Sequence, residues 1–278
     1  MKALYDTFSY SSSKTITRLY STSFSLGIFL LDKTIHNPIY SIYGFVRVAD
    51  EIVDSFHDFD KSQMLQELRR DTYKAINEKI SLNPILNSFQ SVVNEFNIEN
   101  ELIDTFLDSM EMDLEDIVYD SETYEKYILG SAEVVGLMCL RVFTNGDTEM
   151  YENLKPYAMS LGSAFQKINF LRDLEADFEG LGRTYFPGVD FESFDENQKL
   201  QIEKDIKKDF DHALIGIRNL PKIARLGVYA AYVYYTALFQ KIRAISAQRI
   251  MKERIRISNP RKLWLTFYCA MRLRLNLV

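Results

Sequence analysis

The chain has few of the residues that interrupt helices: 11 glycines and 6 prolines among 278 residues. So few breakers over this length favour long helices. Only two cysteines occur, Cys139 and Cys269, and both have apolar neighbours. This excludes a disulfide framework or a cysteine-based metal cluster and is typical of a reducing compartment.

Signals for membranes, export and nucleic acids are also missing. No apolar run reaches the roughly 18–20 residues that a spanning helix needs, so we predict no membrane span. The N-terminal stretch MKALYDTFSYSSSK lacks the apolar core of a signal peptide and carries Asp6 early. The net charge of −6 disfavours nucleic acid as a partner. We therefore expect a cytoplasmic protein.

Helical periodicity dominates what is present, and strand signals are sparse. The pattern predicts helices over 16–31, 38–57, 61–79, 84–95, 99–110, 123–143, 148–178, 195–217, 221–246 and 260–274. No repeat or Pro-, Gly- or Ser-rich linker divides the chain. The sequence therefore predicts one large all-α domain.

Aspartates recur at helical spacing. Asp-x-x-x-Asp pairs occur at 50/54, 54/58, 104/108, 116/120, 173/177 and 205/209. Aspartates four residues apart project from one helix face and repel each other, so most such pairs belong on solvated faces. Asp205 and Asp209 lie among lysines, which is typical of an ordinary exposed face.

Two of the pairs have apolar neighbours instead. Asp50 and Asp54 occur in YGFVRVADEIVD, and Asp173 and Asp177 follow INFL. Charges on an apolar helix are costly unless they are paired or bind metal. Two facing pairs would suit Mg²⁺, which takes oxygen ligands and commonly keeps substrate phosphates in its shell. Diphosphate chemistry is the natural interpretation, with metal and nearby cations stabilising the leaving group.

A di-iron carboxylate bundle is the competing metal interpretation. It requires paired Glu-x-x-His motifs on facing helices. The chain has three histidines and no Glu-x-x-His; Asp54-x-x-His57 and Asp209-x-x-His212 come nearest. We therefore disfavour a di-iron site.

Five blocks, in this order, resemble the squalene/phytoene synthase family of head-to-head prenyl diphosphate synthases. They are SFSLGIFLL (23–31), RVADEIVD (47–54), YILGSAEVVG (127–136), QKINFLRDLEADFEGLGRTYFP (166–187) and YTALFQKI (235–242). The sequence GSAEVVGLMCL is most like the corresponding stretch of bacterial phytoene synthases. The resemblance implies an isoprenoid-synthase fold: one helical bundle domain, 1–278, around a central cavity. Its core would span about 16–262, with an amphipathic C-terminal helix at about 260–278.

The resemblance also implies residue roles. Metal ligands are implied at Asp50, Asp54, Asn169, Asp173 and Asp177. Diphosphate-binding groups are implied at Ser21, Ser23, Arg47, Gln166, Asn169, Arg172, Tyr235 and Arg254. Tyr127 is implied near the reacting carbons, where it would assist proton transfer or steady cationic intermediates. The four aspartates and Tyr127 form the implied catalytic set.

Two positions depart from the family pattern. Glu51 replaces the more frequent second aspartate of Asp-Asp-x-x-Asp. This replacement keeps the negative charge but places it on a longer side chain. Glu133 follows Gly130-Ser131-Ala132, where many members have a small Ala-Gly pair. Glu133 therefore leaves the local shape of the cavity open.

The implied reaction is a Mg²⁺-dependent 1-1′ condensation of two prenyl diphosphates, with Mn²⁺ as an alternative metal. We expect geranylgeranyl diphosphate as the substrate and phytoene as the product, without NADPH. Squalene or dehydrosqualene from two farnesyl diphosphates is the alternative, and squalene would require NADPH. A non-catalytic assembly protein is disfavoured because all four aspartates are present.

The C-terminal stretch NPRKLWLTFYCAMRLRLNLV (259–278) mixes cations with aromatic and aliphatic residues. We favour a helix docked on the bundle, while contact with a membrane surface for product delivery is the alternative. The oligomeric state stays open.

Overall fold

The computed structural model describes residues 1–115, 117, 119–181, 185–189 and 194–274, and none of these forms a strand. The helices are α1 (Lys2–Tyr20), α2 (Thr22–Phe29), α3 (His36–Ser55), α4 (Lys61–Glu78), α5 (Pro84–Phe96), α6 (Asn100–Met112), α7 (Ser121–Ile128), α8 (Val134–Thr144), α9 (Thr148–Leu181), α10 (Glu196–Asn219), α11 (Lys222–Arg243), α12 (Ala247–Ile250) and α13 (Asn259–Arg274). A 3₁₀ turn, η1 (Lys33–Ile35), precedes α3, and a π-helical turn, η2 (Leu129–Glu133), joins α7 to α8. The predicted all-α class is confirmed.

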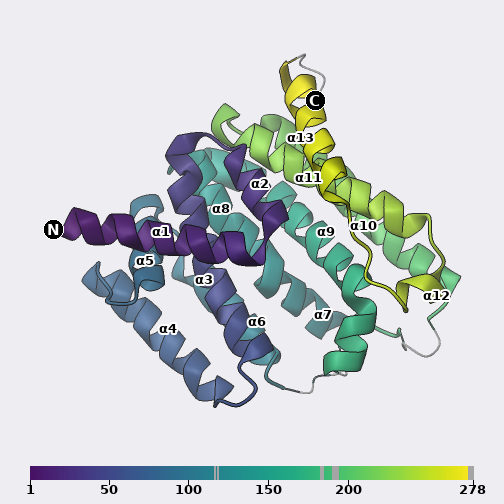
Figure 1. Cartoon of the computed structure of the whole chain (residues 1–278), viewed down its shortest axis with the longest axis horizontal. Coiled ribbons are helices and arrows are strands. Elements are labelled where there is room, and N and C mark those ends of the chain that lie inside the picture. Colours follow the sequence, from purple (N-terminus) through teal and green to yellow (C-terminus); the bar gives the residue numbers. More distant parts are fainter. Residues whose placement is uncertain (116, 118, 182–184, 190–193, 275–278) are drawn as a thin grey trace.

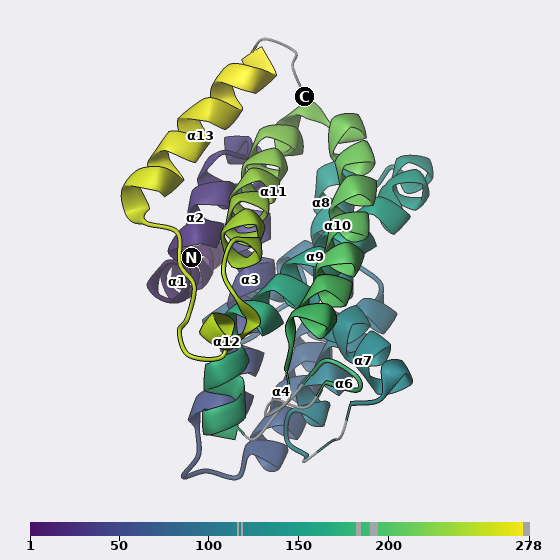
Figure 2. The ribbon, with the colours of Figure 1, turned by 90° about the vertical axis from the view of Figure 1, so that its right-hand side faces the viewer.

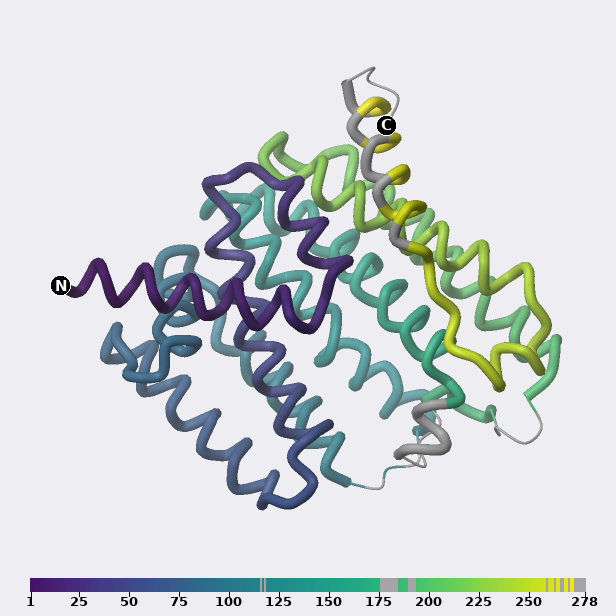
Figure 3. The backbone as a smooth tube through the Cα atoms, in the orientation of Figure 1, coloured from purple at the N-terminus to yellow at the C-terminus, as the bar shows by residue number. Residues whose placement is uncertain are grey.

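The long helix α9 organises the bundle. It packs against α8, α10, α11 and η2, while α3 packs against α1, α5 and α8 on the other side (Figure 1). Helix α13 lies along α11, and Figure 2 shows both beside α2. The tube in Figure 3 shows α1 crossing the bundle, with the N-terminus projecting to one side. Segments from both halves of the chain thus surround a common interior.

One predicted helix is wrong. The range 16–31 is not continuous: α1 ends at Tyr20, Ser21 is extended (φ −140°, ψ 104°), and α2 begins at Thr22. The Ser21 hydroxyl accepts a hydrogen bond from the Phe24 amide at 3.2 Å, which caps α2. A serine cap inside an apolar pattern therefore breaks a helix that periodicity alone would continue.

The start of α1 escaped prediction because its buried side is not hydrophobic. Ser9, Ser13 and Thr17 recur every four residues and are fully or almost fully buried. The Ser13 and Ser88 hydroxyls lie 2.7 Å apart, so hydrogen bonds link α1 to α5. These small side chains also allow Gly44 of α3 to approach α1 closely.

The helical segment Ser121–Thr144, which contains α7, η2 and α8, is long and apolar. Its length and composition would suffice to cross a membrane, but 72% of its most apolar window is buried inside the bundle. A central core helix has the same properties. Cys139 in this segment and Cys269 in α13 are both buried and free.

Candidate active site

A cavity of about 1010 Å³ lies between α2, α3, η2, α8, α9, α10, α11 and the segment after α12. Helix α9 forms one continuous wall. Its lining side chains include Leu154, Ala158, Leu161, Phe165, Asn169 and Asp173, spaced at three or four residues. From Leu154 to Asp173 the helix rises roughly 28 Å at 1.5 Å per residue. The cavity is therefore a long channel rather than a compact pocket.

The two ends of the channel differ in chemistry. Near the start of α9 the wall is apolar and includes Phe143, Leu154 and Leu220. Near Asn169 and Asp173 it is polar and charged. The predicted site residues with described side chains all line this cavity: Ser21, Ser23, Arg47, Asp50, Asp54, Tyr127, Gln166, Asn169, Arg172, Asp173, Tyr235 and Arg254. Asp177 lies on α9, but its side chain is outside the described residues.

The first aspartate pair comes from the last turns of α3. Burial raises the pKa of Asp50 to about 7; Arg47, with Nη1 3.8 Å from the carboxylate, opposes the rise, whereas Asp54 and Asp113 add to it. The negative charge of the Asp50 carboxylate is thus only partly compensated by Arg47. A bound cation would relieve it, so the donor set fits a hard divalent metal.

The second pair is held differently. Arg172 Nη2 lies 2.5 Å from the Asp173 carboxylate, and Arg254 Nε lies 2.7 Å from its other oxygen. Asp173 is therefore already neutralised by two arginines. Among the residues with described side chains, no cluster of three or more His, Cys, Asp or Glu is arranged to hold a metal. Magnesium binding accordingly stays a prediction.

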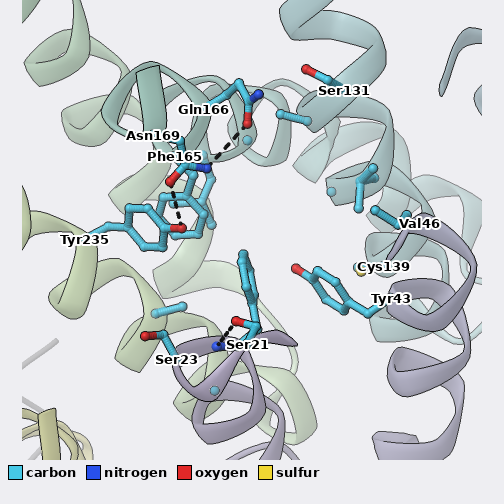
Figure 4. Close-up of a pocket in the computed structure, with 18 of the residues that line it drawn as sticks. Ser21, Ser23, Tyr43, Val46, Ser131, Cys139, Phe165, Gln166, Asn169 and Tyr235 are labelled. Atoms are coloured by element: carbon cyan, nitrogen blue, oxygen red, sulfur yellow. Dashed lines mark hydrogen bonds between the residues drawn. The ribbon is translucent and has the colours of Figure 1, made fainter. Parts of the chain in front are cut away.

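Amide and hydroxyl groups of α9 and α11 meet beside this charged region. The Tyr235 hydroxyl donates to Asn169 Oδ1 at 3.3 Å, and Asn169 Nδ2 donates to Gln166 at 3.5 Å. Tyr235 also stacks on Phe165 with ring centroids 3.9 Å apart. Figure 4 shows these groups facing the same open space as Ser21, which caps α2, and Ser23 within α2. Burial raises the pKa of Tyr235 to about 12, so its hydroxyl stays a donor.

Tyr127 has a partner that the sequence did not reveal. Its hydroxyl donates to Asp113 Oδ2 at 2.8 Å, and both residues are buried and line the cavity. Burial, followed by the Asp113 charge, raises the pKa of Tyr127 well above its usual range. Asp113 follows the last residue of α6 and has no aspartate four residues away, so the Asp-x-x-x-Asp spacing gave no signal for it.

Two more cations at the polar end were missed. Arg256 and Lys262 line the cavity from the segment between α12 and α13 and from α13 itself. Lys262 Nζ lies 3.3 Å from the Thr22 hydroxyl of α2. Only the folding of the C-terminal segment against α2 and α11 reveals their place.

Neither departure from the family pattern lines the cavity. Glu133 lies near Lys167 and Asp209 at the junction with α9 and α10, and burial raises its pKa to about 7. The expectation of an exposed face at Asp209 is wrong. Its carboxylate accepts a hydrogen bond from the buried Lys167 at 2.7 Å, whereas Asp205 is exposed and also contacts Lys167. A lysine on a facing helix, invisible to local pattern, draws Asp209 inward.

Comparison with known proteins assigns the class. The family model for squalene/phytoene synthase matches residues 17–261, which is most of the chain. The chain therefore belongs to the squalene/phytoene synthase family. It is accordingly a prenyltransferase, of the class that condenses prenyl diphosphates head to head.

Individual relatives carry several product names. A presqualene diphosphate synthase from Rhodopseudomonas palustris is 29% identical over an alignment that covers 60% of this chain and 58% of that relative. A phytoene synthase from Rhodobacter capsulatus is 26% identical over 92% of this chain and 79% of that relative. A solved dehydrosqualene synthase has a TM-score of 0.83 and 20% identity, covering 97% of this chain and 98% of that one. This likeness confirms the isoprenoid-synthase fold.

Proposed function

We propose that this chain joins two molecules of geranylgeranyl diphosphate head to head to form phytoene and two diphosphates. The supporting observation is the channel, which carries acids and cations at one end and apolar side chains at the other. This arrangement suits a substrate with a charged head and a long hydrocarbon tail. Similarity to a phytoene synthase favours this product, while the presqualene and dehydrosqualene synthase relatives favour the farnesyl alternative.

The polar end would bind the diphosphates. Mg²⁺, or Mn²⁺ in its place, held by Asp50, Asp54, Asn169, Asp173 and Asp177, would supply positive charge to the departing diphosphate. Arg47, Arg172 and Arg254 would donate charge-assisted hydrogen bonds to its oxygens. Ser21, Ser23, Gln166 and Tyr235 would complete the set of neutral donors. These donors stabilise charge as it develops on the leaving group.

The rest of the channel would control the carbon chemistry. Loss of one diphosphate leaves an allylic cation, the double bond of the second substrate attacks it, and loss of a proton closes a cyclopropyl intermediate that keeps the second diphosphate. A second ionisation, rearrangement and proton loss give phytoene, with no reductant required. The walls, including Tyr43, Val46 and Phe165, exclude water that would quench the cation (Figure 4). Tyr127, oriented by Asp113, would steady the cations or assist the proton loss.

Substrate competition tests the proposal. The purified protein is incubated with farnesyl and geranylgeranyl diphosphates, separately and together, with Mg²⁺ and with or without NADPH. We expect a C40 product, preference for the C20 substrate and no effect of NADPH. Preferred conversion of the C15 substrate to a C30 product would overturn the assignment. Absence of turnover would instead favour a non-catalytic role.

We also propose that the enzyme is cytoplasmic and contacts a membrane surface through α13. This contact would let it deliver its product to the membrane. Trp264, Tyr268 and Met271 are exposed and recur along one face of this helix. Arg261 and Arg272 flank them, and α13 contains no acidic residue. Aromatic and aliphatic groups beside cations suit the surface of an anionic bilayer.

Vesicle flotation tests this contact. The wild type should bind vesicles containing phosphatidylglycerol more strongly than neutral phosphatidylcholine vesicles. Deleting residues 270–278 or replacing Trp264 by serine should weaken the binding, whereas replacing the exposed Leu82 by serine should not. Equal behaviour of all variants would contradict the proposal.

A further inference from the structure

Glu51, which departs from the family pattern, binds Arg47 one helical turn away. Its Oε2 accepts hydrogen bonds from Arg47 Nε at 3.2 Å and from Nη2 at 2.7 Å. Only 14% of the Glu51 side chain is exposed, and it does not line the cavity, whereas Arg47 does. The longer side chain of glutamate thus fixes one edge of the Arg47 guanidinium, which lies at the polar end of the cavity.

Two further side chains hold this pair in place. The Ser55 and Tyr20 hydroxyls hydrogen-bond Glu51, and the ring of Tyr20 covers the Arg47 guanidinium with its centroid 4.2 Å away. Glu51 is therefore held by Arg47, Ser55 and Tyr20, and Arg47 is restrained on an edge and a face.

The unrestrained edge of Arg47 points toward Asp50. Its Nη1 lies 3.8 Å from Asp50 Oδ2, which is longer than a hydrogen bond. Asp50 and Glu51 lie three and four residues after Arg47, so both are within reach of it. While Nε and Nη2 of Arg47 hold Glu51, Arg47 and Asp50 stay outside hydrogen-bond distance.

We infer that Glu51 is a positioning residue that keeps Arg47 from pairing with Asp50. The inference rests on the proposed function. Asp50 then keeps its carboxylate oxygens for a divalent cation, and Arg47 keeps one edge for diphosphate. Without the charge of Glu51, Arg47 turns to Asp50, and the cation must compete with it.

Mn²⁺ binding, measured by electron paramagnetic resonance without substrate, tests the inference. Glu51→Gln keeps the side-chain shape but removes the charge. We expect about tenfold weaker Mn²⁺ binding, equivalent to about 1.4 kcal/mol. Glu51→Asp should recover part of the affinity. The matched control is Asp211→Asn, which breaks the exposed i,i+4 pair with Lys207 on α10 and should leave Mn²⁺ binding unchanged.

A double variant separates competition from structural damage. If Arg47 competes for Asp50, adding Arg47→Gln to Glu51→Gln should restore Mn²⁺ affinity at least to the wild-type value. If Glu51 only supports the fold, the double variant should bind no better than Glu51→Gln. That result, or unchanged Mn²⁺ affinity in Glu51→Gln, would overturn the inference.

Failure of the proposed function looks different. In that case the wild type itself would not form phytoene from geranylgeranyl diphosphate, or would not bind Mn²⁺. A wild type that does both, beside a Glu51→Gln variant with the same Mn²⁺ affinity, rejects only the role of Glu51.

Discussion

At the residue scale, the arginines of the cavity form ion pairs with acidic side chains and are also the groups expected to bind diphosphate. Asp173 holds Arg172 and Arg254 directly, while Glu51 holds Arg47 beside Asp50. Binding a cation at Asp173 would free two arginines for an anion. The ion pairs that satisfy these charges in the structure would therefore give way when a metal and a diphosphate bind together.

Replacing Asp173 by asparagine tests this arrangement. Asparagine keeps the volume and can still accept a hydrogen bond from Arg172 or Arg254, so we expect the fold to persist. Turnover should fall by at least about 100-fold, the scale for losing one group that stabilises a developing charge. Product formation and circular-dichroism melting measure the two effects.

The control for this variant is Asp58→Asn, since Asp58 is exposed and does not line the cavity. It should retain wild-type turnover. Undiminished activity in Asp173→Asn would refute a role of this carboxylate in metal binding.

At the element scale, the π-helical turn η2 separates two environments. Ser131 and Ala132 line the cavity, while Glu133 lies near Lys167 and Asp209. Helix α9 fits closely against this turn, because a side chain at Gly162 would come within 2.8 Å of the Ala132 carbonyl oxygen. The wider π turn thus presents small residues to the channel and directs the charge away from it.

Glu133 should make stability depend on pH. Burial, with Asp209 adding and Lys167 opposing, raises its pKa to about 7 from a usual value of 4.5. Between these values the folded state keeps a proton that the unfolded state releases. The free energy of unfolding therefore falls as pH rises from about 4.5 to 7 through this group.

Glu133→Gln remains neutral throughout and should lose less thermal stability than the wild type between pH 5 and pH 8. Melting temperatures at the two pH values measure the difference. Glu78→Gln, at an exposed glutamate on α4, should behave like the wild type. An identical pH dependence in the wild type and Glu133→Gln would show that Glu133 is not responsible.

The helices that sequence predicted well are those with hydrophobic periodicity. Range 38–57 corresponds to α3 and 148–178 to α9, so the placement of Asp50 and Asp173 on cavity-lining helices followed from local pattern. The start of α1 was missed because small hydroxyl groups, not apolar ones, are buried there. Periodicity measures apolar spacing and is blind to such an interface.

The site residues also divide into those that could be predicted from the sequence and those that could not. The resemblance brought in Gln166, Arg172 and Tyr235, and the structure places all three on the cavity. Asp113 and Lys262 were missed because their proximity to the site depends on the packing of distant segments. The same holds for the role of Glu51, since the orientation of Arg47 between two neighbouring acids is set by Tyr20 and Ser55.

At the scale of the whole molecule, a chain of net charge −6 is expected to bind two polyanionic heads. Long-range repulsion opposes this binding, so local charges must overcome it. The cavity supplies Arg47, Arg172 and Arg254, but Asp50 and Asp54 lie among them. An anion that binds alone is therefore attracted by the arginines and repelled by the aspartates. A divalent cation bound to the aspartates would remove this repulsion and favour binding of the anion.

Thermal stability should reveal this coupling. Mg²⁺ alone and inorganic diphosphate alone should each raise the melting temperature little, while both together should raise it clearly, because only the pair matches the mixed charges. At a ligand concentration of about 100 times Kd, binding to the folded state contributes about 2.7 kcal/mol. For a chain of this size that corresponds to a shift on the order of 5 °C.

Differential scanning fluorimetry over a matrix of the two ligands measures the effect. Asp50→Asn should lose most of the joint shift, because a neutral side chain at the partly uncompensated position binds the cation poorly. The Asp58→Asn control should keep it. Equal and additive shifts from the two ligands, unchanged in Asp50→Asn, would mean that diphosphate binds through the arginines alone and that the aspartates do not recruit a metal.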